Sequence, residues 1–253
     1  MASYLVTGAS RGIGLELVKQ LGKLPADQVS IVFAATRTKE PSAGLQQVID
    51  ASDGKIAHIL LPITDKAGIA AAVPQLEARL GDKGLDVLVN NAGVMGYTPG
   101  GTAAMTDLRE TFEVNVEAVH NTTVALLPLV QKSKLKKVIN ISTTMGSMAL
   151  AANYKFAPTP AYKITKAALN MLTVQYAQDF AQQGVTFLAV SPGWLKTDLG
   201  SQMADLEVDV GVKEVVRIIQ ENGIESSGKF LNIRVPGWEN KVPNAYDGKS
   251  SPW

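Results

Sequence analysis

The segment Tyr162-Lys163-Ile164-Thr165-Lys166 places a phenol four residues before an ammonium group. If the segment is helical, Tyr162 and Lys166 share one face, because residues four apart are neighbours on a helix. A cation there stabilises the tyrosinate and lowers a pKa that is ordinarily about 10. Such a tyrosine can donate a proton to a carbonyl oxygen while a hydride reaches the carbon. By itself the spacing is also common by chance, as an exposed helix pair.

A glycine-rich turn stands where the first apolar run, Tyr4–Thr7, meets a helical pattern. Its glycines, spaced G-x-x-x-G-x-G, allow a tight turn and a close approach of the backbone to a pyrophosphate. The helix that follows offers free N–H groups and the positive end of its dipole. This position favours cofactor binding over a plain structural turn. The predicted contacts are Gly8, Ser10, Arg11, Gly12, Ile13 and Gly14.

The end of the second apolar run predicts which cofactor is bound. A fold that prefers NAD places an acidic residue there to accept from the ribose 2′-hydroxyl, whereas this chain has Thr36 and Arg37. A guanidinium pairs bidentately with a 2′-phosphate that a carboxylate would repel. Arg11, in the glycine-rich turn, would approach the same pocket. Two arginines and a missing acid therefore predict NADPH, with Thr36 and Arg37 among its contacts.

Apolar runs and helical patterns alternate along the chain and place these residues on elements. The runs are apolar on both faces, as parallel strands covered by helices must be, and the alternation predicts a doubly wound α/β fold. One domain over residues 1–253 is expected, with an irregular tail at 236–253. The predicted strands are Tyr4–Thr7, Val29–Thr36, Ile56–Leu61, Leu85–Asn90, Lys137–Thr143, Thr186–Ser191 and Lys229–Ile233, and the predicted helices lie near 12–24, 42–51, 65–80, 106–132, 161–183 and 211–222.

Composition excludes several other classes of protein. The chain has no cysteine and only two histidines, so disulfides, thiolate sites and cysteine nucleophiles are excluded and no metal is expected. The net charge is +1, with no long basic run for a nucleic acid. No apolar run approaches the length needed to span a bilayer, and the first residues do not resemble a signal peptide. We therefore expect a cytoplasmic protein acting on a small molecule, without nucleic-acid or membrane partners.

Three further polar segments stand at the ends of the fourth, fifth and sixth predicted strands: Asn90–Gly93, Asn140–Gly146 and Ser191–Thr197. Ligands of open α/β sheets bind outside the carboxyl ends of the strands. With these segments the sequence resembles the short-chain dehydrogenase/reductase family over nearly the whole chain up to about residue 233. The matching motifs are TGASRGIG at 7–14, NNAG at 90–93, Asn115 in EVNV, the hydroxyls at 142–144, YKITK at 162–166 and PGWLKT at 192–197.

The resemblance implies a seven-stranded parallel sheet in the order 3-2-1-4-5-6-7, and a catalytic tetrad of Asn115, a hydroxyl residue, Tyr162 and Lys166. It also implies that Asn115 holds a water on the proton path. The remaining implied cofactor contacts are Asn91, Ala92, Gly93, Tyr162, Lys166, Pro192, Gly193, Leu195 and Thr197. More closely, the chain resembles the fungal branch of norsolorinic acid ketoreductase-like and C-factor-like reductases. The features are Arg37, the approach APTPAY, a late Gly-Lys-Phe run and an end in Pro-Trp.

Three departures from the family pattern bear on the site. The family's catalytic hydroxyl lies three residues before a glycine, which favours Thr143 over Ser142, with Ser142 as the alternative. The gap from Thr143 to Tyr162 is longer than usual, so residues 149–158 are expected to form a loop at the substrate mouth. The family's adenine-contacting Asp aligns with Pro62, and Asp65 is expected to cap a helix instead.

The function expected from these residues is NADPH-dependent reduction of a hydrophobic, aromatic or polyketide-like ketone or aldehyde, with Tyr162 as proton donor. The alternatives are an NAD-dependent alcohol dehydrogenase and a non-catalytic dinucleotide-binding regulator. The expected substrate walls are Met95, Tyr97, Met145, Met148, Tyr154, Phe156, Trp194 and Met203. Family members often pair through the helices near 106–132 and 161–183. A homodimer or homotetramer is therefore expected, with Leu169, Leu172 and Tyr176 toward the partner.

Overall fold

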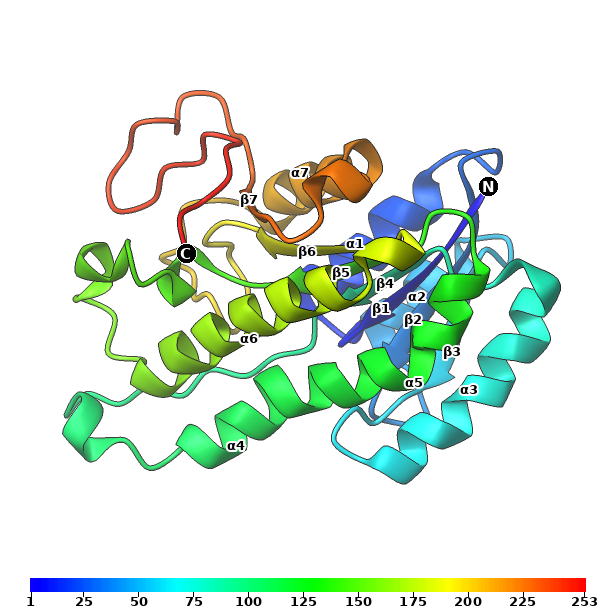
Figure 1. The fold of residues 1–253 in the computed structure, drawn as a ribbon, viewed down its shortest axis with the longest axis horizontal. Coiled ribbons are helices and arrows are strands. Elements are labelled where there is room, and N and C mark those ends of the chain that lie inside the picture. Colours follow the sequence, from blue (N-terminus) through cyan, green and yellow to red (C-terminus); the bar gives the residue numbers. More distant parts are fainter.

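The computed structural model describes residues 1–253 and contains one seven-stranded parallel sheet. The strand order is β3-β2-β1-β4-β5-β6-β7, which confirms the predicted fold class (Figure 1). The strands are β1 (Ala2–Thr7), β2 (Val29–Thr36), β3 (Ile56–Leu60), β4 (Val87–Asn90), β5 (Lys137–Ile141), β6 (Thr186–Ser191) and β7 (Phe230–Asn232). Because β1 pairs with both β2 and β4, the order reverses there and opens the crevice in which such sheets bind ligands.

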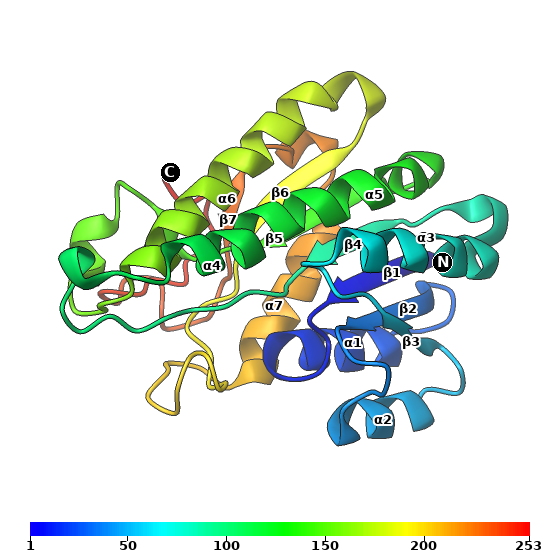
Figure 2. The same cartoon turned by 90° about the horizontal axis from the view of Figure 1, so that it is seen from below.

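Helices cover both faces of the sheet, as the uniformly apolar strands require (Figure 2). One face carries α1 (Gly12–Lys23), α2 (Ala43–Asp50) and α7 (Val208–Glu221), and the other carries α3 (Lys66–Leu80), α5 (Ala118–Lys132) and α6 (Pro160–Asp179). Each face has its own apolar core, and the two cores share the buried strands. None of the helices is long and apolar enough to cross a membrane.

The predicted helix near 106–132 is present with a local widening. The short α4 (Leu108–Phe112) continues into α5 through one π-helical turn, Glu113–Glu117. Such turns interrupt the regular hydrogen-bond ladder and often mark functional positions. Asn115 lies in this turn and is fully buried.

The predicted partner-facing residues of α6 are part of the chain's own core. Leu169 is 1% exposed and Tyr176 is 9% exposed, and Tyr176 belongs to the apolar core on this face of the sheet. The expectation that they face a second subunit is therefore wrong. Helical spacing identifies one apolar face of a helix, but only the packing of the sheet shows whether that face is already covered.

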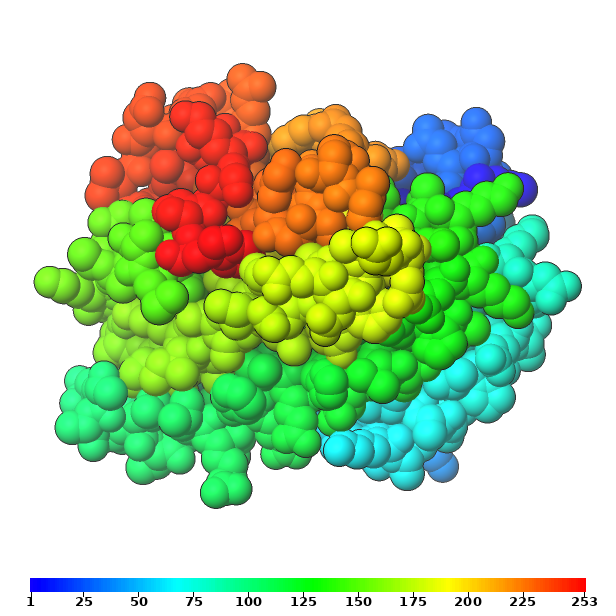
Figure 3. All heavy atoms as spheres, in the orientation of Figure 1, coloured from blue at the N-terminus to red at the C-terminus, as the bar shows by residue number.

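The tail after β7 has no helix or strand of its own but is folded back on the sheet edge. Antiparallel bridges join Leu231 to Ser250 and Arg234 to Asp247, and the Trp253 ring stacks on Phe230 at a centroid distance of 5.5 Å. The backbone N–H of Ala149 also donates to the Trp253 carbonyl at 3.1 Å. The tail thus lies against the segment that follows β5, where Figure 3 shows red atoms beside green ones.

Candidate active site

The glycine-rich turn after β1 has the conformation expected of a phosphate cradle. Gly8 and Gly12 adopt positive φ angles of 68° and 56°, which favour glycine. A Cβ on Gly14 would lie 2.3 Å from the Gly8 carbonyl oxygen, so only glycine fits there. The first turn of α1 has no acidic residue and no side-chain cap, which leaves its N–H groups free for an anion.

The Thr7 hydroxyl joins the ends of β1 and β4 across the crevice. It accepts from the backbone N–H groups of Asn91 at 3.0 Å and Ala92 at 3.1 Å. The Asn91 amide in turn donates to the Thr7 carbonyl at 2.9 Å. Sequence reasoning placed Thr7 at the end of a strand and in the TGASRGIG motif but assigned its hydroxyl no task. The signal that could have found it is a hydroxyl residue directly before the first glycine of the turn.

Tyr162 and Lys166 lie on the same buried face of α6, as their spacing predicted. The Lys166 ammonium donates to the Ile141 carbonyl at the end of β5 at 2.8 Å, and it lies 5.7 Å from the centroid of the Tyr162 ring. Burial lowers the pKa of Lys166 to about 8 and raises the pKa of Tyr162 above its ordinary value. The predicted lowering of the Tyr162 pKa is thus wrong for the ligand-free protein, because loss of solvent outweighs the nearby cation.

The two candidate hydroxyls after β5 have different surroundings. Ser142 is 2% exposed, and its hydroxyl donates to the Asn170 side chain of α6 at 2.6 Å. Thr143 is half-buried, and its oxygen accepts from the Met145 N–H at 3.2 Å. The Thr143 hydroxyl hydrogen therefore stays available for a ligand, whereas that of Ser142 is used inside the protein. This difference favours Thr143 as the hydroxyl of the site.

Asn115 fastens the loop after β4 to α6. Its Oδ1 accepts from the Val94 N–H at 2.9 Å, and its Nδ2 donates to the Val94 carbonyl at 2.9 Å. The second amide hydrogen goes to the Thr165 hydroxyl at 3.1 Å. Both amide hydrogens are thus engaged within the chain. The side chain therefore cannot donate to the water that the family resemblance assigned to it.

Comparison with known proteins identifies the family. The family model described as short chain dehydrogenase matches residues 3–207. The chain belongs to the short-chain dehydrogenase family. It is therefore an oxidoreductase, and the family resemblance inferred from the motifs is confirmed.

Three known proteins are similar to this chain in sequence or in structure. The short-chain dehydrogenase/reductase atnB of Arthrinium sp is 34% identical over 215 residues, which cover 81% of this chain and 78% of the relative. The C-signal protein of Myxococcus xanthus is 33% identical over 170 residues, or 67% of this chain and 93% of that protein. The crystal structure of NADPH-bound carbonyl reductase from chicken fatty liver matches with a TM-score of 0.86 and 30% identity, covering 100% of this chain and 99% of that one.

In this short-chain dehydrogenase, Arg37 follows β2 with its side chain exposed and without an ion-pair partner. The neighbouring Thr36 hydroxyl is 2.7 Å from the His58 Nε2 and donates to the Thr38 carbonyl at 3.0 Å. The hydroxyl of Thr36 is therefore engaged in holding its own loop. Of the two residues predicted here, only Arg37 offers an unengaged polar group.

Arg11 does not lie free beside Arg37, as the sequence suggested. Its guanidinium forms an ion pair with Asp198 at 2.8 Å, and both side chains are largely exposed. Asp198 belongs to the loop after β6, which also brings the Thr197 side chain to 3.4 Å from a Cβ built on Gly12. This loop thus faces the glycine-rich turn across the crevice, and the exposed pair is worth at most about 1 kcal/mol.

The segment after β6 places the remaining predicted cofactor contacts. Gly193 has a φ of 85°, and a Cβ there would come within 2.8 Å of the Ile233 side chain. Leu195 is buried and bridges to Leu206, while the Thr197 hydroxyl accepts from the Gly200 N–H at 3.0 Å. Pro192 directly follows β6 and is buried. These contacts hold the segment as a turn over the carboxyl end of the sheet.

Most of the predicted substrate-wall residues are accessible. Four apolar side chains are strongly exposed on three different loops: Tyr97 (71%), Met148 (76%), Phe156 (60%) and Met203 (83%). Met95, Met145 and Trp194 are half-buried. Tyr154 is only 3% exposed and its hydroxyl is hydrogen-bonded to Thr144, so its assignment as a wall residue is wrong.

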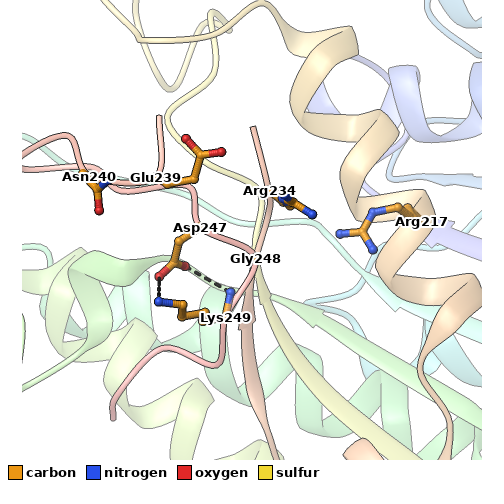
Figure 4. Close-up of a pocket in the computed structure, with 7 residues that line it drawn as sticks. All are labelled: Arg217, Arg234, Glu239, Asn240, Asp247, Gly248 and Lys249. Carbon is orange, nitrogen blue, oxygen red and sulfur yellow. Dashed lines mark hydrogen bonds and ion pairs between the residues drawn. The ribbon is translucent and has the colours of Figure 1, made fainter. Parts of the chain in front are cut away.

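A separate polar hollow of about 360 Å³ lies between α7 and the tail (Figure 4). It is lined by Arg217, Arg234, Glu239, Asn240, Asp247, Gly248 and Lys249. Its charges are largely paired within the chain, Arg217 with Glu214 and Glu221 and Lys249 with Asp247. None of the predicted cofactor or catalytic residues lines it, and its lining has no apolar side chain for a hydrophobic substrate.

Proposed function

We propose that this short-chain dehydrogenase is an NADPH-dependent carbonyl reductase for hydrophobic ketones or aldehydes. The observation that carries the proposal is the buried pair Tyr162 and Lys166, with Lys166 bound to the Ile141 carbonyl just before Thr143, whose hydroxyl hydrogen is available. Because burial raises the pKa of Tyr162, the phenol stays protonated at neutral pH. A protonated phenol is the form needed to donate a proton to a reduced carbonyl oxygen.

The residues around the crevice suit a dinucleotide. A Cβ on Gly8 or Gly14 would collide with neighbouring backbone, the positive φ of Gly12 favours glycine, and the uncapped N-terminus of α1 offers N–H groups to phosphates. Bound NADPH would supply the hydride. The reductase from chicken fatty liver, whose structure contains NADPH, supports this cofactor for a chain of such similar fold.

Each member of the proposed site has a distinct task. Tyr162 donates its phenolic proton to the carbonyl oxygen as negative charge develops there. Thr143 donates its hydroxyl hydrogen to the same oxygen and fixes its position, with Ser142 held back by Asn170. Lys166, anchored on the Ile141 carbonyl, would bind the ribose of the cofactor and stabilises the tyrosinate left after proton transfer. Asn115 holds the loop at Val94 against α6, and this fixes the position of the preceding segment Asn91–Gly93.

Arg37 supports NADPH over NADH. Its exposed guanidinium has no carboxylate partner and follows β2, where it can meet a 2′-phosphate. Arg11 contributes only after it leaves Asp198, which is a small cost for an exposed pair. Positions 36 and 37 carry Thr and Arg, so neither has a carboxylate that could accept a hydrogen bond from the 2′-hydroxyl of NADH.

The exposed apolar side chains support a hydrophobic substrate. Tyr97, Met148, Phe156 and Met203 come from the loops after β4, β5 and β6, which all follow carboxyl ends of strands. Methionine and aromatic side chains adapt to flat or irregular apolar molecules. An aromatic or polyketide-like ketone fits this lining better than a small polar one.

The test is turnover of NADPH with a panel of carbonyl compounds. Aromatic and long-chain ketones and aldehydes are compared with small polar ones, while NADPH absorbance is followed, and Tyr162→Phe is the control. We expect consumption of NADPH with the hydrophobic members and none with the variant. Oxidation of alcohols with NAD but no reduction would favour the dehydrogenase alternative. Tight NADPH binding without turnover in either direction would favour a non-catalytic regulator.

A further inference from the structure

One half-buried carboxylate, that of Asp205, connects the loop after β6 to the C-terminal tail. Asp205 Oδ2 accepts from the Tyr246 hydroxyl at 2.5 Å and from the Asn244 amide at 2.7 Å. Tyr246 is 3% exposed and Asn244 is 9% exposed, while Asp205 is half-buried, so both hydrogen bonds are partly shielded from water. A charge-assisted hydrogen bond in such surroundings is stronger than a neutral one.

The first arm of this network reaches the segment beside the proposed cofactor. The Tyr246 hydroxyl has one hydrogen, which it gives to Asp205, so its oxygen accepts from the Trp194 backbone N–H at 3.1 Å. Trp194 directly follows Gly193 in the turn after β6. Burial, with the Asp205 charge, raises the pKa of Tyr246, so the hydroxyl remains a donor at neutral pH.

The second arm reaches the segment beside the proposed catalytic hydroxyl. Because a carboxylate only accepts, Asp205 requires the amide nitrogen of Asn244, and the Asn244 oxygen then faces the Tyr154 hydroxyl at 3.2 Å. The Tyr154 hydroxyl also lies 2.6 Å from the Thr144 hydroxyl. When Tyr154 donates to Asn244, Thr144 donates to Tyr154. Asp205, together with the Pro243 carbonyl 3.4 Å from the Tyr154 hydroxyl, thus favours one hydrogen-bond direction as far as the neighbour of Thr143.

We propose that Asp205 is a positioning residue, and that the tail acts through it as part of the active site. Through Tyr246 and Asn244 it holds the segments after β5 and β6 at a defined separation on either side of the substrate. This inference rests on the proposed function, because it concerns the placement of Thr143 and of the turn at Pro192–Thr197. A purely structural tail anchor would affect stability alone.

Tyr246 and Asn244 lie in the tail, about forty residues after Asp205 in the sequence. Asp205→Asn keeps the shape and an acceptor oxygen but removes the negative charge, so the two charge-assisted hydrogen bonds become weaker neutral ones. Tyr246→Phe removes only the arm that ends on Trp194.

The experiment compares Asp205→Asn and Tyr246→Phe with a matched control, Tyr176→Phe. Tyr176 is also a buried tyrosine whose hydroxyl has one side-chain partner, His120 at 2.8 Å, but it lies outside the network. For each variant, kcat, KM, the NADPH Kd and Tm are measured. We expect kcat/KM to fall about 10-fold or more in the two network variants. The NADPH Kd should change less than about threefold, since its phosphates bind elsewhere.

A double variant tests whether the two changes act in one chain. Asp205→Asn with Tyr246→Phe should lose less kcat/KM than the product of the single losses. The proposal is overturned if kcat/KM in the network variants stays within the range of Tyr176→Phe, or follows Tm alone. Amide exchange at Trp194 provides a readout that needs no turnover. It should accelerate in Tyr246→Phe and not in Tyr176→Phe, and unchanged exchange would overturn the network even if no carbonyl compound is reduced.

Discussion

The ammonium of Lys166 is tied to the Ile141 carbonyl at 2.8 Å and stands 5.7 Å from the centroid of the Tyr162 ring. The lysine is therefore fixed to the end of β5 and not to the phenol. This placement leaves the Tyr162 hydroxyl for a substrate while a positive charge stays close enough to stabilise the tyrosinate. The two residues share a helix face, but a strand carbonyl decides where the charge lies.

Replacement of Tyr162 by Phe should abolish most turnover and leave NADPH binding nearly unchanged. Only the proton donor is lost, and general acid catalysis contributes about 100-fold or more. The measurements are kcat with the best carbonyl substrate and the NADPH Kd by titration. Turnover close to that of the unaltered protein would contradict the assigned mechanism.

Removal of each of the two hydroxyls after β5 should have a different effect on activity and on stability. Thr143→Val is expected to lower kcat/KM about 10- to 100-fold, because it removes a hydrogen bond to a charged oxygen. Ser142→Ala should lower activity less, but it leaves the buried Asn170 oxygen without its donor and costs about 1–3 kcal/mol of stability. Steady-state kinetics and denaturant unfolding measure the two effects. A larger loss of activity in Ser142→Ala would show that Ser142 is the catalytic hydroxyl.

Cofactor preference should depend on Arg37. In the unaltered protein, charge-assisted hydrogen bonds from Arg37, and from Arg11 after it leaves Asp198, predict a preference for NADPH over NADH of about 100-fold. Arg37→Asp removes one cation and adds a repelling charge, so NADPH should weaken by about 10- to 100-fold or more while NADH is spared. Arg11→Ala is the matched control and should weaken NADPH less, since Arg11 must first leave Asp198. Equal affinity of the unaltered protein for both cofactors in titrations at moderate salt would refute the assignment.

Lys166 should make the stability of the cofactor-free protein depend on pH. Its pKa is lowered by burial from 10.5 to about 8, so between these values the unfolded chain binds more protons than the folded one. The free energy of unfolding contributed by this group therefore rises with pH across that window. In Lys166→Met this contribution is absent, so the variant should gain stability relative to the unaltered protein at pH 7 and lose that advantage toward pH 10. Denaturant unfolding at both pH values measures it, and a pH-independent difference would contradict the lowered pKa.

Local patterns were enough to predict the elements that carry the site. The bounds of β2 and β6 are as expected, and Asp65 caps α3 by accepting from the Ala67 N–H at 3.0 Å. These features depend on turn chemistry and on apolar runs, which neighbouring residues encode. The seven-strand order came from the family resemblance and is confirmed. The end of β5 was placed too late, at Thr143, because Thr143 already caps the short helical turn Thr144–Gly146 by accepting from the Met145 N–H.

The sequence by itself determined the phosphate cradle, the pairing of Tyr162 with Lys166 on one helix face and the family. Only the tertiary structure decided that burial raises the Tyr162 pKa, that Arg11 is paired with Asp198 and that the tail reaches Asp205 through Tyr246. The physical reason is one of range. Backbone conformation and helix periodicity are set by adjacent residues, whereas desolvation, ion pairing and hydrogen-bond direction depend on groups that the fold brings together from distant parts of the chain.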